Sequence, residues 1–194
     1  MGKWIYTTLS LCAWDDCVAK VTISNELCYL AGMLSGLPKI TSKICIRTQM
    51  PDIEQRFIEI AIKAIGIDPK RIKVEEDSAG FNSVYFYDSK TAHAITSILG
   101  RNKYIFRMPT PASLSYLAGI FDSRGHISGN GIYIKGLTPS DSIILEGFGV
   151  HTSADGMVKN ITRLLKLVTG YSILAEKVLS DLKQNARAST TEDL

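Results

Sequence analysis

The sequence contains few cysteines and no spacing that would use them together. The four cysteines are Cys12, Cys17, Cys28 and Cys45, no two of them have the CxxC spacing, and none follows Cys45. A disulfide-stabilised secreted domain is normally shorter and richer in cysteine. We therefore interpret these residues as reduced thiols that are buried or half-buried.

Long hydrophobic runs are also lacking. The richest apolar stretch, Phe57 to Ile67, is interrupted by Glu59 and Lys63, and it is shorter than the roughly 20 residues that span a bilayer. The first residues contain no continuous apolar segment of the kind found in signal peptides. We expect an intracellular, cytoplasmic protein with no membrane partner.

Common catalytic and cofactor-binding patterns are missing as well. The chain has no glycine-rich phosphate loop and no GxSxG elbow, and His93 and His151 have no cluster of metal ligands near them in sequence. We interpret Asp122 as a capping or packing residue near a helix end and His126 as a loop residue, so no cofactor and no metal are expected.

Composition permits a partner of opposite charge without requiring one. The formal net charge is +3 over 194 residues, and the excess lies entirely in the second half, since residues 1–100 carry 11 Lys/Arg and 11 Asp/Glu while residues 101–194 carry 11 and 8. A hydrophobic content of 45% is sufficient for a substantial core. Such a chain is compatible with nucleic-acid binding but is not diagnostic of it.

An internal repeat organises the chain. The segment from Tyr29 to Gly36 (YLAGMLSG) is echoed by the segment from Tyr116 to Ser123 (YLAGIFDS), 87 residues later since 117 − 30 = 87. Ser24 or Asn25 before the first copy, and Thr110 with Pro111 before the second, are typical helix starts. Each copy is followed by a short β-type run, which predicts a duplicated helix-then-strand unit.

Other elements can be placed more coarsely. We expect strands over residues 3–12 and 18–23, an amphipathic helix over 52–65, a hairpin of 71–75 with 83–87, and a helix over 89–99 that ends at Gly100. In the second half we expect a strand over 142–146 and helices over 157–168 and 172–182, followed by a frayed tail from Asn185.

The two repeats resemble degenerate LAGLIDADG motifs of the homing endonucleases. Leu30 to Pro38 (LAGMLSGLP) and Leu117 to Gly125 (LAGIFDSRG) both keep the first three motif positions, and the second also keeps the sixth-position aspartate and the closing glycine. The resemblance covers residues 25–135 well, and the rest only by the expected order of elements.

The family implies an α+β fold of two pseudo-symmetric αββαββα halves, here residues 1–109 and 110–194. The two motif helices would pack at a pseudo-twofold axis, and two antiparallel sheets would form a saddle over DNA. The C-terminal half is the shorter, so its sheet is expected to be truncated. Small residues four apart allow two helices to approach closely; the interface is predicted to contain Leu30, Ala31, Gly32, Gly36, Leu117, Ala118, Gly119 and Ser123.

Active relatives carry an acidic residue at the eighth motif position of each half to hold divalent cations. Here those degenerate catalytic positions hold Leu37 and Arg124, and neither side chain binds Mg²⁺, which requires oxygen ligands. We therefore expect no nuclease activity. A guanidinium at position 124 would partly replace the charge of a cation beside a phosphate, although simple drift after loss of cleavage explains Arg124 equally well. A displaced metal site through Asp122 is the remaining route to an active nuclease.

Side chains in the predicted strands alternate between an apolar face and a face with basic, hydroxyl or aromatic groups. The second face suits contacts with phosphates and bases. The candidate nucleic-acid-binding residues are Lys20, Lys39, Lys43, Arg47, Arg71, Lys73, Tyr85, Arg124, Tyr133 and Lys135. For any one strand a merely solvated face is the simpler interpretation. The acidic run Glu75 to Asp77 at the predicted hairpin tip counts against DNA there, because carboxylates repel phosphates.

The leading hypothesis is a monomeric, catalytically inactive homologue that binds double-stranded DNA. Two alternatives stay open. One is an RNA-binding, maturase-like role in intron splicing, and the other is a structural module with a protein partner that reuses the fold.

Overall fold

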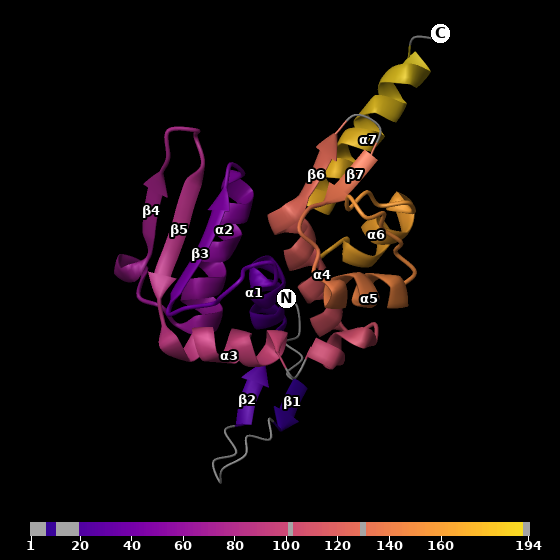
Figure 1. Ribbon diagram of the computed structural model, residues 1–194. Helices are drawn as coiled ribbons and strands as arrows, with labels where there is room; N and C mark the ends of the chain where they lie inside the picture. Colours follow the sequence, from indigo (N-terminus) through magenta and orange to yellow (C-terminus); the bar gives the residue numbers. More distant parts are fainter. Residues whose placement is uncertain (1–6, 11–19, 101–102, 129–130, 192–194) are drawn as a thin grey trace.

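A central pair of helices divides the molecule into two groups of helices and strands. The computed structural model describes residues 7–10, 20–100, 103–128 and 131–191. The central pair is α1 (Asn25–Leu34) and α4 (Pro111–Arg124), with the other elements arranged on either side (Figure 1). Both helices begin as the sequence predicts: the Ser24 side chain caps α1, and Thr110 forms a capping box with Ser113 at the start of α4.

The two central helices touch through their glycines. A Cβ atom added to Gly32 would lie 2.0 Å from the carbonyl oxygen of Tyr116, and one added to Gly119 would lie 2.0 Å from that of Tyr29. Each glycine therefore meets the carbonyl of the tyrosine three residues before the other glycine. This reciprocity places a pseudo-twofold axis between α1 and α4, and only glycine permits so close an approach at both points.

The first group is a three-stranded antiparallel sheet covered by helices on one face. β3 (Lys43–Thr48) and β4 (Lys73–Glu76) both pair with β5 (Asn82–Tyr87), which is the central strand. α2 (Pro51–Glu59) continues as a π-helix over Ile60–Ile65, which ends at Gly66, where φ is +82°. α2 packs on the sheet: the ring centroids of Phe57 in α2 and Phe86 in β5 are 5.6 Å apart. The remaining elements before α4 are β1 (Thr7–Ser10), β2 (Lys20–Ile23), η2 (Pro69–Arg71), α3 (Ser89–Leu99) and η3 (Lys103–Arg107).

No helix of the described segments covers the opposite face of this sheet, which is called the outer face below. Alternation along the strands directs Ile44 and Ile46 into the core and Lys43 and Arg47 outward. The strand register brings eight side chains together on the outer face: Lys43, Cys45 and Arg47 of β3, Ser83, Tyr85 and Tyr87 of β5, and Lys73 and Glu75 of β4.

The second group contains less sheet. β6 (Gly125–Ser128) pairs with β7 (Gly131–Ile134), and an isolated bridge joins Tyr133 of β7 to Met157. The helices of this group are α5 (Pro139–Gly147), α6 (Ile161–Val168) and α7 (Ile173–Thr191), and α7 extends away from the body (Figure 1).

Three expectations for this half were wrong. Residues 142–146 form part of α5 rather than a strand, because Thr138 caps a helix that has Pro139 at its first position and Asp141 in a capping box. Residues 157 and 158 form bridges rather than a helical turn, and α6 begins only at Ile161. The tail expected to fray from Asn185 continues α7 as far as Thr191.

The molecule is therefore an α+β fold with helices packed centrally and antiparallel sheets on both sides, as predicted. Within the described residues, the strand content departs from two αββαββα units: one strand, β3, lies between α1 and α2, and the hairpin expected after α5 is reduced to a bridge between Thr152 and Val158. A continuous hydrophobic core runs through both groups, and the division at residue 109 stays a prediction. No helix among the described residues is long and apolar enough to cross a membrane.

Candidate nucleic-acid interface and the ends of the central helices

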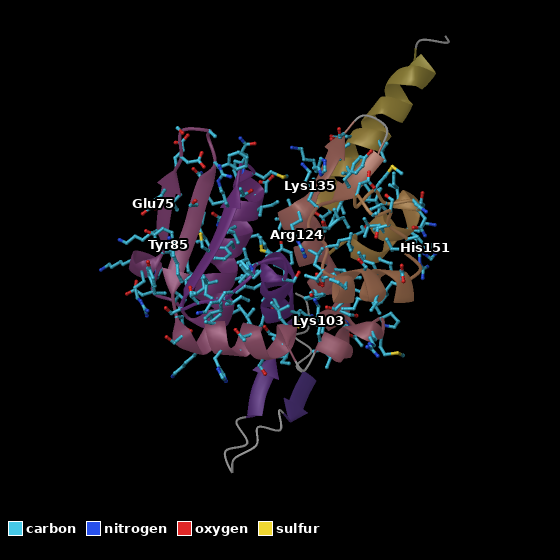
Figure 2. The ribbon with its side chains drawn as sticks, viewed as in Figure 1. Glu75, Tyr85, Lys103, Arg124, Lys135 and His151 are labelled. Carbon is cyan, nitrogen blue, oxygen red and sulfur yellow. The ribbon has the colours of Figure 1, made fainter. Side chains whose placement is uncertain are left out.

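A cavity of about 280 Å³ lies where the C-terminal ends of α1 and α4 meet β3. Leu37, three residues beyond the end of α1, lines it and is 49% exposed. Arg124, the last residue of α4, lines it from the other side (Figure 2). The two eighth motif positions thus meet at one place, and their side chains are an alkyl group and a guanidinium.

The Arg124 side chain is turned inward across the contact between the two halves. It donates hydrogen bonds to the Ser35 hydroxyl at the end of α1 and, over 2.8 Å, to the Gly136 carbonyl. An ion pair with Asp141 at 3.7 Å completes its surroundings, and the side chain is only 13% exposed. This internal use of the guanidinium argues against the phosphate contact expected for Arg124, which stays a prediction.

Asp141 is the fully buried acceptor of this cluster. Its carboxylate accepts hydrogen bonds from Tyr116 (2.6 Å) and Thr138 (2.6 Å) and forms an ion pair with Lys103 at 2.8 Å. Burial alone would raise the pKa of Asp141, but the hydrogen bonds from Lys103, Thr138 and Tyr116 outweigh it, so the pKa is lowered. Asp141 is ionised at neutral pH and ties α4, α5 and the segment between the halves together.

Asp122, at the sixth motif position, is also a buried carboxylate that accepts several hydrogen bonds. It accepts hydrogen bonds from the hydroxyls of Tyr29 (2.6 Å) and Ser172 (2.5 Å) and from the backbone N–H groups of Ile173 (3.0 Å) and Leu174 (2.9 Å). Burial nevertheless raises its pKa above the usual value. Asp122 thus caps the start of α7, in agreement with the capping role expected from the sequence, and His126 lies in β6 rather than in a loop.

The predicted interface residues lie as follows. Leu30, Ala31, Leu117 and Ala118 are at most 1% exposed, and Gly32 and Gly119 make the reciprocal contacts already described. Gly36 lies against the Arg124 side chain, whose Nη1 would be 2.7 Å from an added Cβ. Ser123 donates to the Gly119 carbonyl within its own helix and lines the cavity.

Four candidate binding residues of the first half, Lys43, Arg47, Lys73 and Tyr85, lie on the outer face. Lys43, Arg47 and Lys73 are exposed there. Tyr85 is only 9% exposed because Lys43 lies 3.9 Å above its ring and its hydroxyl donates to Glu75, an interaction that raises the pKa of Tyr85 to about 12. Lys39 is exposed in the loop after α1.

The remaining candidates are dispersed. Arg71 lies in η2 and donates to the Tyr87 carbonyl over 2.7 Å. Tyr133 of β7 lies against His126, with ring centroids 5.3 Å apart, and Lys135 just beyond β7 is exposed (Figure 2). Lys20 is in β2, but its side chain lies outside the described residues.

Sequence reasoning missed Lys103, Ser35 and Asp141 as a cluster. Ser35 and Asp141 are 106 residues apart, so no local spacing joins them. A usable signal was the run from Thr138 to Asp141, which repeats the Thr-Pro helix start at Thr110 and Pro111.

The acidic hairpin tip also has a role that its charge alone does not indicate, because Asp77 accepts a hydrogen bond from Arg47. That bond and those from the backbone of Phe81 and Ala79 lower the pKa of Asp77.

The fold is that of the homing endonucleases. The chain is similar to I-DmoI: a structure of mesophilic variants of that homing endonuclease shares 14% identity and a TM-score of 0.53, covering 74% of this chain and 88% of that chain. An I-DmoI variant in complex with its target DNA in the presence of manganese shares 14% identity and a TM-score of 0.54, covering 78% of this chain and 96% of that chain. I-DmoI in complex with DNA and manganese shares 14% identity and a TM-score of 0.52, covering 76% of this chain and 97% of that chain. No family model matches the sequence, and no curated protein matches it either.

Proposed function

We propose that the protein is a catalytically inactive, homing-endonuclease-like protein that binds double-stranded DNA as a monomer through the outer face of its first sheet. The observation that carries this proposal is the outer face itself. Three exposed cations lie on the two strands that flank β5, Lys43 and Arg47 on β3 and Lys73 on β4, and no helix among the described residues covers that side of the sheet. The major groove accepts a β-ribbon or sheet, and I-DmoI, which has the same fold, is described in complex with its target DNA.

The ends of the central helices support the inactive part of the proposal. A divalent cation expected of the family does not fit the groups present, since Leu37 offers no donor atom and Arg124 brings a positive charge. Both oxygens of Asp122 are taken up by α7 and Tyr29. Among the described residues, no three His, Cys, Asp or Glu side chains form a group that could hold a metal ion.

Binding is tested by fluorescence anisotropy with labelled duplex DNA and structured RNA, from about 50 to 200 mM salt. Saturable duplex binding that weakens steeply with salt is expected, because each phosphate contact releases counterions. Preference for the RNA would replace the DNA proposal with the RNA-binding one. Absence of binding to both at the lowest salt would contradict a nucleic-acid function and favour a protein partner.

The outer face is tested with matched charge changes. Lys73→Gln removes an exposed cation from the outer face, whereas Lys63→Gln removes one from the helix on the opposite side of the sheet, where Lys63 is 69% exposed. If Lys73 contacts a phosphate, its loss reduces the slope of log affinity against log salt by about 1, and the control leaves the slope unchanged. Equal effects of the two changes would show that the outer face is not the contact surface.

Inactivity is tested with supercoiled plasmid, or plasmid bearing the preferred duplex, in Mg²⁺ and in Mn²⁺. We expect no nicking above a buffer control. Metal-dependent nicking that copurifies with the protein and disappears in Asp122→Asn would overturn this part and revive a displaced metal site, while leaving the DNA-binding part intact.

A further inference from the structure

Arg47 is held in one orientation on the exposed outer face. It lies near the end of β3, opposite Ser83 of β5, and its side chain is 55% exposed. A free arginine at such a position would sample many rotamers, and fixing it costs conformational entropy at the moment of binding. Here two neighbours have already restricted it.

The first neighbour is Asp77 at the tip of the β4–β5 hairpin. One carboxylate oxygen, Oδ2, accepts from Arg47 Nε over 2.9 Å and from Nη2 over 2.5 Å. The other oxygen, Oδ1, accepts from the backbone N–H groups of Ala79 (2.9 Å) and Phe81 (3.1 Å). Because the turn itself fixes the carboxylate, Asp77 cannot swing away with Arg47, and it sets the direction of the guanidinium.

The second neighbour is Phe81, whose ring centre lies 4.1 Å from the central guanidinium carbon of Arg47. An aromatic face at this distance attracts the cation and restricts the tilt of its plane. An exposed ion pair adds little to folding stability. The main physical effect of Asp77 and Phe81 is therefore to orient the guanidinium plane.

The donors that remain free form a matched pair. A guanidinium has five N–H donors in a fixed plane. Asp77 uses Nε–H and one hydrogen of Nη2, which leaves the outer edge made by Nη1 and the second hydrogen of Nη2. No partner for Nη1 is found within the described part of the chain. Two parallel donors on one edge match the O6 and N7 acceptors that guanine presents in the major groove.

We infer that Arg47, positioned by Asp77 and Phe81, recognises a guanine base in the major groove, and that Asp77 is a specificity-determining positioning residue rather than a source of repulsion. The inference rests on the proposed DNA-binding function and goes beyond it by assigning one base and the residue pair that selects it. A phosphate also accepts two parallel hydrogen bonds from arginine, so the experiment must separate a base from a phosphate.

The preferred duplex is first selected from a random library with the unmodified protein, and every single base-pair replacement of that duplex is then measured by anisotropy. The same panel is measured with Arg47→Lys, which keeps the charge but loses the planar donor pair. We expect one G·C position at which the unmodified protein discriminates by about 5- to 150-fold and at which Arg47→Lys loses most of that discrimination, with other positions unaffected.

Asp77→Asn tests the positioning role. The asparagine keeps an oxygen for the turn N–H groups but withdraws the carboxylate from Arg47. It should weaken discrimination at the same guanine position. Glu76→Gln is the matched control, since it removes one negative charge from the same hairpin but belongs to the opposite face of β4, and it should leave the guanine preference intact. Thermal melts establish that each variant is folded.

The outcomes separate the two levels of the proposal. A uniform loss of affinity across the panel in Arg47→Lys would mean a phosphate contact and overturn the inference, as would a guanine preference that survives Arg47→Lys. A uniform gain of affinity in Asp77→Asn with unchanged preference would mean that Asp77 only screens Arg47. Failure of the unmodified protein to bind any duplex would instead overturn the proposed function itself.

Discussion

Gly32→Ala should destabilise the protein severely, because the added methyl group meets backbone rather than a side chain. Its Cβ would lie 2.0 Å from the Tyr116 carbonyl oxygen and 3.0 Å from the Ile120 nitrogen. Neither atom can rotate away, so the two central helices must separate. Overpacking a core costs about 1 to 3 kcal/mol, and a clash with rigid backbone belongs at the upper end.

The corresponding change in melting temperature is measurable. For a chain of this size each 1 kcal/mol shifts Tm by about 2–4 °C, so a cost of about 3 kcal/mol lowers Tm by roughly 6–12 °C. Gly119→Ala should cost a similar amount, because its contact with Tyr29 is the reciprocal one. The assay is thermal unfolding followed by circular dichroism, supported by urea titration.

Gly147→Ala is the matched control. Gly147 is also helical, in α5, and nothing lies within 4 Å of an added Cβ, so alanine should leave stability unchanged or raise it by up to about 1 kcal/mol. If Gly32→Ala melts within 2 °C of the unmodified protein, about the shift expected for 1 kcal/mol or less, the helices do not approach as described, and the argument for a pseudo-twofold contact fails.

Asp141→Asn should cost about 3 kcal/mol or more at pH 7, because it leaves Lys103 and Arg124 without their buried partner; urea titration measures the loss. Since the pKa of Asp141 is lowered in the folded state, its stabilising contribution is complete above its unfolded pKa of about 4 and disappears as pH falls through the folded pKa. The difference in stability between the unmodified protein and Asp141→Asn should therefore shrink in acid, and a difference constant from pH 7 to pH 3 would contradict this. The pH dependence of stability that comes from Asp122 has the opposite sign, because its pKa is raised in the folded state and folding becomes less favourable as pH rises above its unfolded pKa. Asp122 is present in both proteins, so its contribution cancels when the stability of Asp141→Asn is subtracted from that of the unmodified protein. Burial raises the pKa of the Cys28 thiol to about 12, so iodoacetamide at pH 8 followed by peptide mapping should leave Cys28 unmodified until denaturant is added, and rapid labelling of the native protein would refute its burial.

The features predicted from the sequence were those specified by neighbouring residues. Helix α3 occupies residues 89–99 as expected, since Asp88 caps it and it ends at Gly100. The close contact of α1 and α4 was also predicted, from the resemblance to the family and from small residues four apart in both motif helices, a spacing that allows two helix backbones to approach closely. Both inferences use a pattern contained within one helix.

The features that could not be predicted join distant parts of the chain. Arg47 lies in β3 and Asp77, 30 residues later, lies in the turn after β4. The sequence indicated only their opposite charges, so the acidic hairpin tip was expected to repel DNA. The helix at 139–147 was missed for another reason: its β-branched residues favoured a strand, although the capping signal at Thr138 was present and decided the local structure.

The contacts between the two halves bear on whether the peptide bond that joins them is needed for their assembly. Tyr29 to Asp122 and Arg124 to Ser35 are hydrogen bonds that cross from one half to the other, alongside the two glycine contacts. Lys103, just after the end of the first half's last helix, is anchored to Thr138 and Asp141 of the second. Fragments 1–109 and 110–194, produced separately, therefore each retain a complete side of this contact. The pair is expected to reassemble as a noncovalent dimer, and the single chain can be regarded as two partners tethered at high effective concentration.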